Sequence, residues 1–217
     1  MKHEKKHYAL TRETPTETIT IEGPLEKEEL QQYKFHEDLI AFRPPSKQFE
    51  AILNISTFPE GRIIIARTND TIIGYVTYLH PDPLERWSEF KMDELIELGA
   101  IEVIPAFRGA RIASALLEVS MMDAFMENYI IISTEYYWHW DLNGTKLSIW
   151  DYRKVMEKMM AAGGLVPAST DDPEIISHPA NCLMVRIGKN VSEHSIKRFN
   201  TLRFLQRHKY RNMQGGL

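Results

Sequence analysis

The stretch IEVIPAFRGARIASALL, residues 101–117, decides the fold of this chain. Apolar residues alternate up to Val103, which predicts a strand that ends there, and Pro105 interrupts the pattern. From Ile112 onward the apolar residues recur at helical spacing on one face, through to about Asn128. The sequence therefore predicts a strand, a short loop and a helix in direct succession.

The loop between this strand and this helix contains Arg108 and Gly109. The first turn of a helix leaves its N–H groups unpaired and carries the positive end of the helix dipole. Gly109 lets the backbone approach an anion closely, and Arg108 adds a fixed positive charge. The loop thus suits a phosphate group. An ordinary strand–loop–helix connection remains an alternative, because no Walker or dinucleotide glycine spacing is present.

Hydrophobic periodicity outward from this stretch predicts the remaining elements. The predicted strands lie around residues 19–21 and at 62–67, 71–80, 95–103, 130–134, 165–170 and 182–187. The predicted helices cover residues 27–39, 46–57, 112–128, 150–162 and 192–207. Because this order mixes hairpins with helical crossovers, we expect an α+β fold. It should have a mixed central sheet of about six to seven strands flanked by helices.

Three parts are expected along the chain. Residues 1–16 are polar and predict a flexible N-terminal arm. Residues 17–190 should form one domain, in which EYYWHWDLNGTKLSIW (135–150) is an aromatic insertion. From residue 191 to 217, six Lys or Arg residues accompany one Glu, which predicts a basic, amphipathic C-terminal helix and tail packed on that domain.

Composition and spacing also exclude several functions. The sequence contains no run of eighteen apolar residues and no signal-peptide pattern, so we expect a cytoplasmic protein without membrane contact. The net charge is −4 and no nucleic-acid motif is present, so we expect no nucleic-acid partner. The single cysteine, Cys182, lies in an apolar run and should be a buried small residue. His139 has no neighbours at metal-ligand spacing, so no metal site is predicted.

The pattern V-x-P-x-F-R-G-x-x-x-A at residues 103–113 resembles the pyrophosphate-loop signature of the GNAT superfamily of N-acetyltransferases. The resemblance implies the GNAT fold, with acetyl-CoA as co-substrate. It also implies that the following residues contact CoA: Val103, Ile104, Arg108, Gly109, Ala110, Arg111, Ile112, Ala113 and Ser114. One position departs from the signature, because the family usually has glycine where this chain has Arg111.

A wider resemblance covers residues 21–207 or so. The blocks TFPEGRIIIAR, GYVTYLHPDPLERWSE, ELIELGAIEV, TEYYWHWDL and SHPANCLMVRIGKNVS resemble the acetoin-utilization acetyltransferases within the superfamily. That resemblance implies acetylation of the catalytic lysine of AMP-forming acetyl-CoA synthetase, which inactivates this enzyme. Two alternatives remain open, namely acetylation of a small amine and repression by an acetyl-CoA-sensing protein that binds its partner without turnover. A homo-oligomer also remains open.

An amine that attacks a thioester must be neutral, so a carboxylate should accept its proton. The strand at 95–103 offers Glu102, which is nearest the expected thioester, and Glu97, which matches the base position of histone-acetylating relatives. Simple alternation places these two carboxylates on opposite faces of the strand. Both are kept as candidates for the catalytic base.

The acid and the acceptor side are less well specified. Met159 and Met160 occupy the region where many GNAT enzymes have a catalytic tyrosine, so the proton donor to the leaving thiolate is left open between water and Tyr152, Tyr136 or Tyr137. Arg43 and His178 lie in loops that border the acceptor side in this family. We therefore expect both on the substrate side, although a surface role is an alternative for each.

Overall fold

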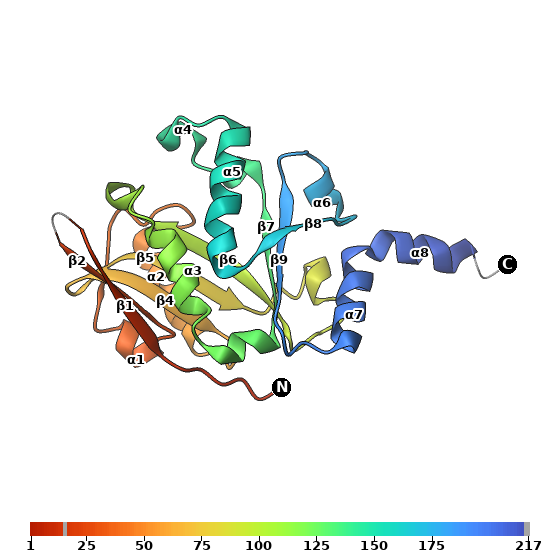
Figure 1. Cartoon of the computed structure of the whole chain (residues 1–217), viewed down its shortest axis with the longest axis horizontal. Coiled ribbons are helices and arrows are strands. Elements are labelled where there is room, and N and C mark those ends of the chain that lie inside the picture. The colour runs from red at the N-terminus through yellow and green to blue at the C-terminus, as the bar shows by residue number, and fades with distance from the viewer. Residues whose placement is uncertain (15–16, 215–217) are drawn as a thin grey trace. The chain divides into compact units, whose positions relative to one another are not determined.

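The computed structural model describes residues 1–14 and 17–214 of the chain. The chain forms two compact units, the first made of Met1–His80 and Ile96–Met126 and the second of Pro81–Leu95 and Glu127–Leu217. The strands of unit 1 are β1 (Tyr8–Glu13), β2 (Thr18–Gly23), β3 (Lys34–Phe35), β4 (Arg62–Thr68), β5 (Thr71–Leu79) and, apart from its first residue, β6 (Leu95–Val103). Its helices are α1 (Lys27–Leu30), α2 (Pro45–Ser56) and α3 (Ile112–Ser120) (Figure 1).

The strands of unit 1 pair in the order β1-β2-β4-β5-β6, and each neighbouring pair is antiparallel. The short β3 pairs in parallel with the start of β5, so the sheet is mixed. Figure 1 shows α3 in front of these strands and α2 behind them. Helix α3 contacts β1, β2, β4 and β5, and α2 contacts β3, β4 and β5. The α+β class and the mixed, helix-flanked sheet that the sequence predicted are confirmed.

Strands β4 and β5 form the centre of unit 1. Each residue from Ile63 to Ala66 is at most 1% exposed, and Ile72, Ile73, Tyr75, and Val76 are equally buried. A strand in which every residue is buried, instead of every second one, has both of its faces covered. The continuous β-branched run of β4 therefore reflects a strand packed between α3 and α2, in agreement with the predicted hairpin.

The start of the chain, expected to be a flexible arm, is ordered over residues 8–13 as β1. Residues 15–16 lie outside the described part. The segment before β1 is held by the buried guanidinium of Arg62, which hydrogen-bonds the carbonyl of Glu4 and lies 3.7 Å from the carboxylate of Asp123. The prediction failed because the polar composition of YALTRE hides an alternation in which every second side chain is half-buried.

The helix predicted over residues 27–39 is also wrong beyond its first turn, because α1 ends at Leu30. The chain then becomes extended, and the N–H groups of Lys34 and His36 donate to the carbonyls of Asp70 and Ile72 at 2.8 and 3.1 Å. Pairing with β5 thus overrides the local helical pattern. With β1 and β3 added, the described residues contain nine strands, compared with the six to seven expected.

Unit 2 contains the strands β7 (Ile130–Glu135), β8 (Val166–Ala168) and β9 (Cys182–Ile187), and the helices α4 (Leu142–Thr145), α5 (Ile149–Met160), α6 (Pro173–Ile176), α7 (Glu193–Arg203) and α8 (Leu205–Gln214). The strands pair antiparallel in the order β7-β9-β8. Phe199 and Leu202 of α7 enter the core of this unit beside Trp87 and Leu183. The single C-terminal helix that was predicted is two helices, because the chain breaks at Phe204 (φ −119°, ψ 40°).

Within residues 1–14 and 17–214, none of the helices combines the length and apolar character needed to cross a lipid bilayer.

Candidate functional site

A bulge interrupts β6, the strand that carries the candidate bases. Thr77 of β5 lies opposite Ala100, but the next residue, Tyr78, lies opposite Leu98. Gly99 is therefore an extra residue on β6, and such a bulge shifts the alternation of side chains by one position. A Cβ added at Gly99 would come within 2.8 Å of Cδ2 of Leu79, so a larger residue there requires the end of that side chain to move.

The bulge places Glu97 and Glu102 on the same face of the sheet. Glu97 lies opposite Leu79 and Glu102 opposite Tyr75, and these two positions of β5 are four residues apart. Residues separated by an even number share a face of a strand. The prediction that Glu97 and Glu102 lie on opposite faces is therefore wrong. At about 3.3 Å per residue, their positions are roughly 13 Å apart along the strand, so a single reacting atom can meet only one of them.

The carboxylate of Glu102 is held by two hydrogen bonds. Its Oε1 accepts the N–H of Ala41 at 2.8 Å, and its Oε2 accepts the hydroxyl of Tyr75 at 2.9 Å. Tyr75 is fully buried, and burial together with the neighbouring Glu102 raises the pKa of its hydroxyl above the ordinary value. The phenol therefore stays protonated and acts as a donor. Each carboxylate oxygen keeps a second lone pair for a further partner.

A chain of hydrogen bonds connects Arg43 to Glu102. The exposed Arg43 donates through Nη1 to Oε1 of Gln48 at 3.3 Å. Gln48, which is 2% exposed, hydrogen-bonds the hydroxyl of Tyr75, and that hydroxyl donates to Glu102. Two residues that the sequence nominated separately, Arg43 and Glu102, thus belong to one network. Donors arranged head to tail polarise one another, which strengthens the bond at the carboxylate end.

The loop after β6 has two residues in the left-handed region. A 3₁₀ turn covers Pro105–Phe107, and Gly109 follows with φ +86°. A Cβ added at Gly109 would meet nothing within 4 Å, so the backbone conformation, and not space, favours glycine there. Arg111 adopts φ 58° and ψ 27° as the residue that caps α3. The one departure from the family signature therefore falls on a position where the backbone conformation itself favours glycine.

The first turn of α3 directs free N–H groups into the loop. In the part of the chain that the structure describes, no side chain caps this helix, so the amides of Ile112, Ala113 and Ser114 are without the usual partner. The amide of Ile104, by contrast, donates to the carbonyl of Ile73 at 3.0 Å, and the Ile104 side chain is buried. Anion contacts through backbone N–H groups are therefore expected from the later loop residues and not from Ile104.

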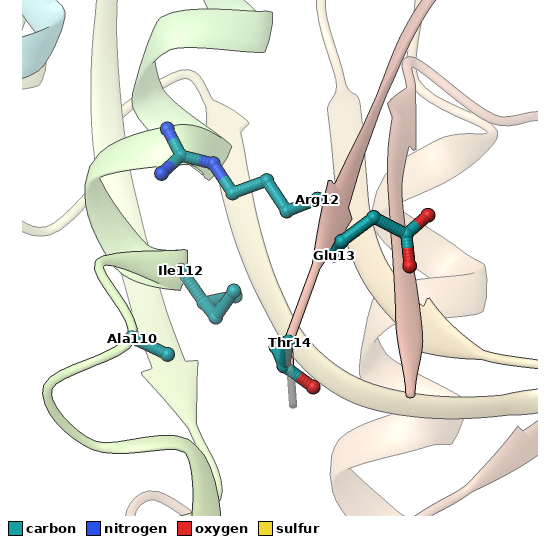
Figure 2. Close-up of a pocket in the computed structure, with 5 residues that line it drawn as sticks. All are labelled: Arg12, Glu13, Thr14, Ala110 and Ile112. Carbon is teal, nitrogen blue, oxygen red and sulfur yellow. The ribbon is translucent and has the colours of Figure 1, made fainter. Parts of the chain in front are cut away.

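A shallow pocket of about 360 Å³ lies beside this loop (Figure 2). Ala110 and Ile112 line it from the loop and α3, and Arg12, Glu13 and Thr14 line it from the end of β1. Figure 2 shows the side chains of Ala110 and Ile112 turned toward β1, while the Glu13 carboxylate points away from them. No role was predicted for β1 from the sequence. The alternation of YALTRE was the signal that was available.

In unit 2, His178 packs against one of the candidate acids. Its ring centroid lies 4.2 Å from that of Tyr137, and its Nδ1 accepts the N–H of Ala180 at 3.1 Å. Tyr152 stacks on Trp140 at 5.1 Å, in the aromatic insertion. The hydroxyl of Tyr136 has its pKa raised by burial and by nearby carboxylates. The described contacts do not favour one of the three tyrosines as proton donor.

A half-buried carboxyl group for which no role was predicted lies at the end of β7. Glu135 accepts hydrogen bonds from the hydroxyl of Ser133 at 2.8 Å and from Nε1 of Trp140 at 3.3 Å. Loss of solvent raises its pKa above the ordinary value of 4.5, since no cation compensates for burial in the contacts described. Its partner across the strands is Cys182, whose thiol pKa burial raises to about 12. That thiol is therefore unsuited to act as a nucleophile.

Among the described residues, no group of three or more His, Cys, Asp or Glu side chains is placed to hold a metal ion.

The model of the Acetyltransferase (GNAT) family matches residues 27–141, which include β6, the loop and α3. The chain belongs to this family. This GNAT protein is 61% identical to the acetoin utilization protein AcuA of Bacillus subtilis and 63% identical to that of Bacillus licheniformis, over 97% of this chain and all of each relative. The crystal structure of an acetoin utilization protein from Exiguobacterium sibiricum matches with a TM-score of 0.92 at 56% identity, covering 95% of this chain and 98% of that one.

Membership of the GNAT family identifies the protein as an acyltransferase, as the sequence predicted. Enzymes of this family use acetyl-CoA as the acyl donor, and the loop with its two left-handed residues and free amides fits an anionic cofactor. Tyr75 and Gln48, which connect the predicted site residues Arg43 and Glu102, were not predicted from the sequence. Their role follows from strand pairing and from the packing of α2 on β5, neither of which leaves a local pattern in the sequence.

Proposed function

We propose that this GNAT enzyme transfers the acetyl group of acetyl-CoA to the catalytic lysine of AMP-forming acetyl-CoA synthetase and thereby inactivates the synthetase. The full-length similarity to acetoin utilization proteins supports a role in the same area of metabolism. The structural observation that carries the chemistry is the position of Glu102. Its carboxylate is fixed by two hydrogen bonds one residue before Val103, where β6 ends and the loop that fits an anion begins.

Binding of acetyl-CoA is assigned to the loop and to the first turn of α3. The amide of Gly109 and those from Arg111 to Ser114 would hold the pyrophosphate, because the helix N-terminus supplies both free donors and a favourable dipole. The amide of Ala110 already donates to the carbonyl of Phe107 at 3.2 Å. Arg108 and Arg111 are exposed and carry positive charge beside these amides. Val103, at the end of β6, is assigned to the pantetheine arm of the cofactor.

Glu102 is assigned as the general base. The amine of a lysine is protonated at neutral pH, since its ordinary pKa is about 10.4, and it must lose a proton before it can attack the thioester. Glu102 would accept that proton, directly or through one water molecule, while the new C–N bond forms and the C–S bond breaks. The electron pair of the broken bond leaves on sulfur as a thiolate, which then takes a proton from water or from a tyrosine hydroxyl.

Glu102 is preferred to Glu97 because of its place on the strand. Glu102 is adjacent to Val103, whereas Glu97 lies about 13 Å farther from the loop along β6. We expect Glu102→Gln to lower kcat by about 10²- to 10⁴-fold, the usual contribution of a general base. Glu97→Gln, prepared in parallel, tests the assignment. A larger loss in Glu97→Gln than in Glu102→Gln would transfer the role to Glu97.

The acceptor is tested by incubating the enzyme with radiolabelled acetyl-CoA and purified acetyl-CoA synthetase. The expected result is label on the synthetase that disappears when its catalytic lysine is changed to alanine. Turnover of spermidine without any label on the synthetase would overturn the proposal in favour of a small amine. Repression of the synthetase by a Glu97→Ala/Glu102→Ala double variant that transfers no label would instead indicate that complex formation, and not acetylation, controls the target.

A further inference from the structure

One face of strand β1 lies against helix α3, the helix that follows the proposed acetyl-CoA loop. Side chains alternate along β1, and Tyr8, Leu10 and Arg12 are the half-buried ones. Helix α3 contacts β1 as well as β2. Arg12 is therefore a cation on the half-buried face of an edge strand, where inward-pointing charges are one of the ways in which edges are protected from further pairing. This placement requires a partner for the charge.

The partner of Arg12 is Glu118 of α3. The Nη2 of Arg12 lies 3.0 Å from Oε2 of Glu118, and their side chains are 31% and 38% exposed. Glu118 uses one of the five donors of the guanidinium, which leaves donors for a second acceptor. An ion pair exposed to this degree contributes at most about 1 kcal/mol to stability, so it orients the guanidinium more than it stabilises the fold.

The same arginine lines the pocket beside the acetyl-CoA loop. Figure 2 shows the stem of Arg12 running from β1 toward α3, with Ala110 and Ile112 facing it across the pocket. The pocket thus adjoins the start of α3, where the amides of Ile112, Ala113 and Ser114 lack the usual partner, and the Arg12 cation is fixed beside the same helix. This combination complements a phosphate, and arginine is suited to it because its planar guanidinium can make two parallel hydrogen bonds.

We propose that Arg12, held by Glu118, binds the 3′-phosphate of CoA and makes β1 part of the cofactor site. This inference rests on the proposed site for acetyl-CoA at the loop after β6. The 3′-phosphate is favoured over the pyrophosphate by position. Glu118 lies six residues after Ile112, about 9 Å along the helix axis from the loop amides. The 3′-phosphate is the CoA phosphate that lies beyond the pyrophosphate, separated from it by the ribose.

The test compares CoA with 3′-dephospho-CoA, which retains the pyrophosphate. Dissociation constants of both are measured by calorimetry for the full-length protein and for Arg12→Gln, Arg12→Lys and Lys27→Gln. Lys27→Gln is the matched control, because it removes one exposed positive charge of unit 1 at the start of α1. Arg12→Gln should weaken CoA binding by about tenfold, as expected for a charge-assisted hydrogen bond, and should leave 3′-dephospho-CoA binding unchanged. Arg12→Lys should recover part of the loss.

Two results would overturn the inference. Equal weakening of CoA and 3′-dephospho-CoA by Arg12→Gln would show that Arg12 acts on the pyrophosphate or only on the structure of the loop. Unchanged CoA binding would show that Arg12 has no part in the site. Neither result affects the proposed loop site, which fails separately if Gly109→Val binds CoA as tightly as the unaltered protein does. Thermal denaturation of each variant confirms that β1 still folds.

Discussion

Arg111 provides a quantitative test of the loop before α3. Its backbone lies at φ 58° and ψ 27°, in the left-handed region that residues with a Cβ adopt at a cost. We compare Arg111→Gly with Arg111→Ala, because both variants lose the same long side chain and differ only in the Cβ atom. The comparison therefore isolates the energy of the backbone conformation from any contribution of the guanidinium group.

The expected difference follows from two opposing terms. A left-handed conformation costs a residue with a Cβ about 1.5 kcal/mol, which glycine avoids. Glycine in turn loses about 0.7 kcal/mol more than alanine through the greater freedom of its unfolded chain. The net expectation is that Arg111→Gly unfolds with a free energy about 0.8 kcal/mol higher than Arg111→Ala. For a protein of this length, that difference corresponds to a melting temperature about 2–3 °C higher.

The free energy of unfolding of both variants is measured by thermal and urea denaturation. A second glycine and alanine pair, made at Glu50, serves as a control in which we expect the opposite order of stability. Glu50 lies at an exposed position within α2, where Glu50→Gly should be about 1 kcal/mol less stable than Glu50→Ala. If the alanine variant were the more stable one at position 111 as well, the left-handed conformation of the loop would be wrong. The loop would then not present its amides through two left-handed residues.

Two further predictions concern Tyr75 and Glu135. Tyr75→Phe removes the donor between Gln48 and Glu102 and should lower kcat about tenfold, which is less than the loss expected for Glu102→Gln. Tyr33→Phe serves as a control outside this network. An unchanged kcat in Tyr75→Phe would mean that the Glu102 carboxylate needs no orientation by Tyr75. The raised pKa of Glu135 means that the folded state binds its proton more tightly, so the stability of the unaltered protein relative to Glu135→Gln should fall as the pH rises above about 4.5. Urea denaturation across the pH range checks this, and a difference that does not change with pH would contradict it.

The parts of the fold that were predictable from the sequence share a physical feature. The strands at 95–103 and 182–187 have the predicted bounds, because each is a mainly apolar run that turn residues or Pro105 interrupt. Such runs can bury their side chains in a sheet whatever the rest of the chain does. The position of the loop after Val103 was likewise predictable, since Pro105 interrupts the strand pattern and helical spacing begins at Ile112.

The failures depend on contacts between distant residues. Residues 34–35 pair with β5, and this pairing ended a helix that the local periodicity favoured. The extra residue at Gly99 is visible only when β6 is aligned with its neighbour, and it reversed the prediction about the faces of Glu97 and Glu102. Simple alternation cannot detect a bulge, because the sequence of one strand does not record the register of the next.

The anchoring of β1 also has a consequence for how the protein is made. Two residues that hold β1 in place have partners late in the chain. The backbone N–H of Lys6 donates to Asp123, 117 positions later, and Arg12 pairs with Glu118, 106 positions later. During synthesis the N-terminal segment therefore leaves the ribosome long before Asp123 and Glu118 exist. Contacts of such sequence separation form slowly. The wall of the pocket that β1 provides is thus completed only after α3 has been translated, so a nascent chain that stalls within the first hundred residues would lack it.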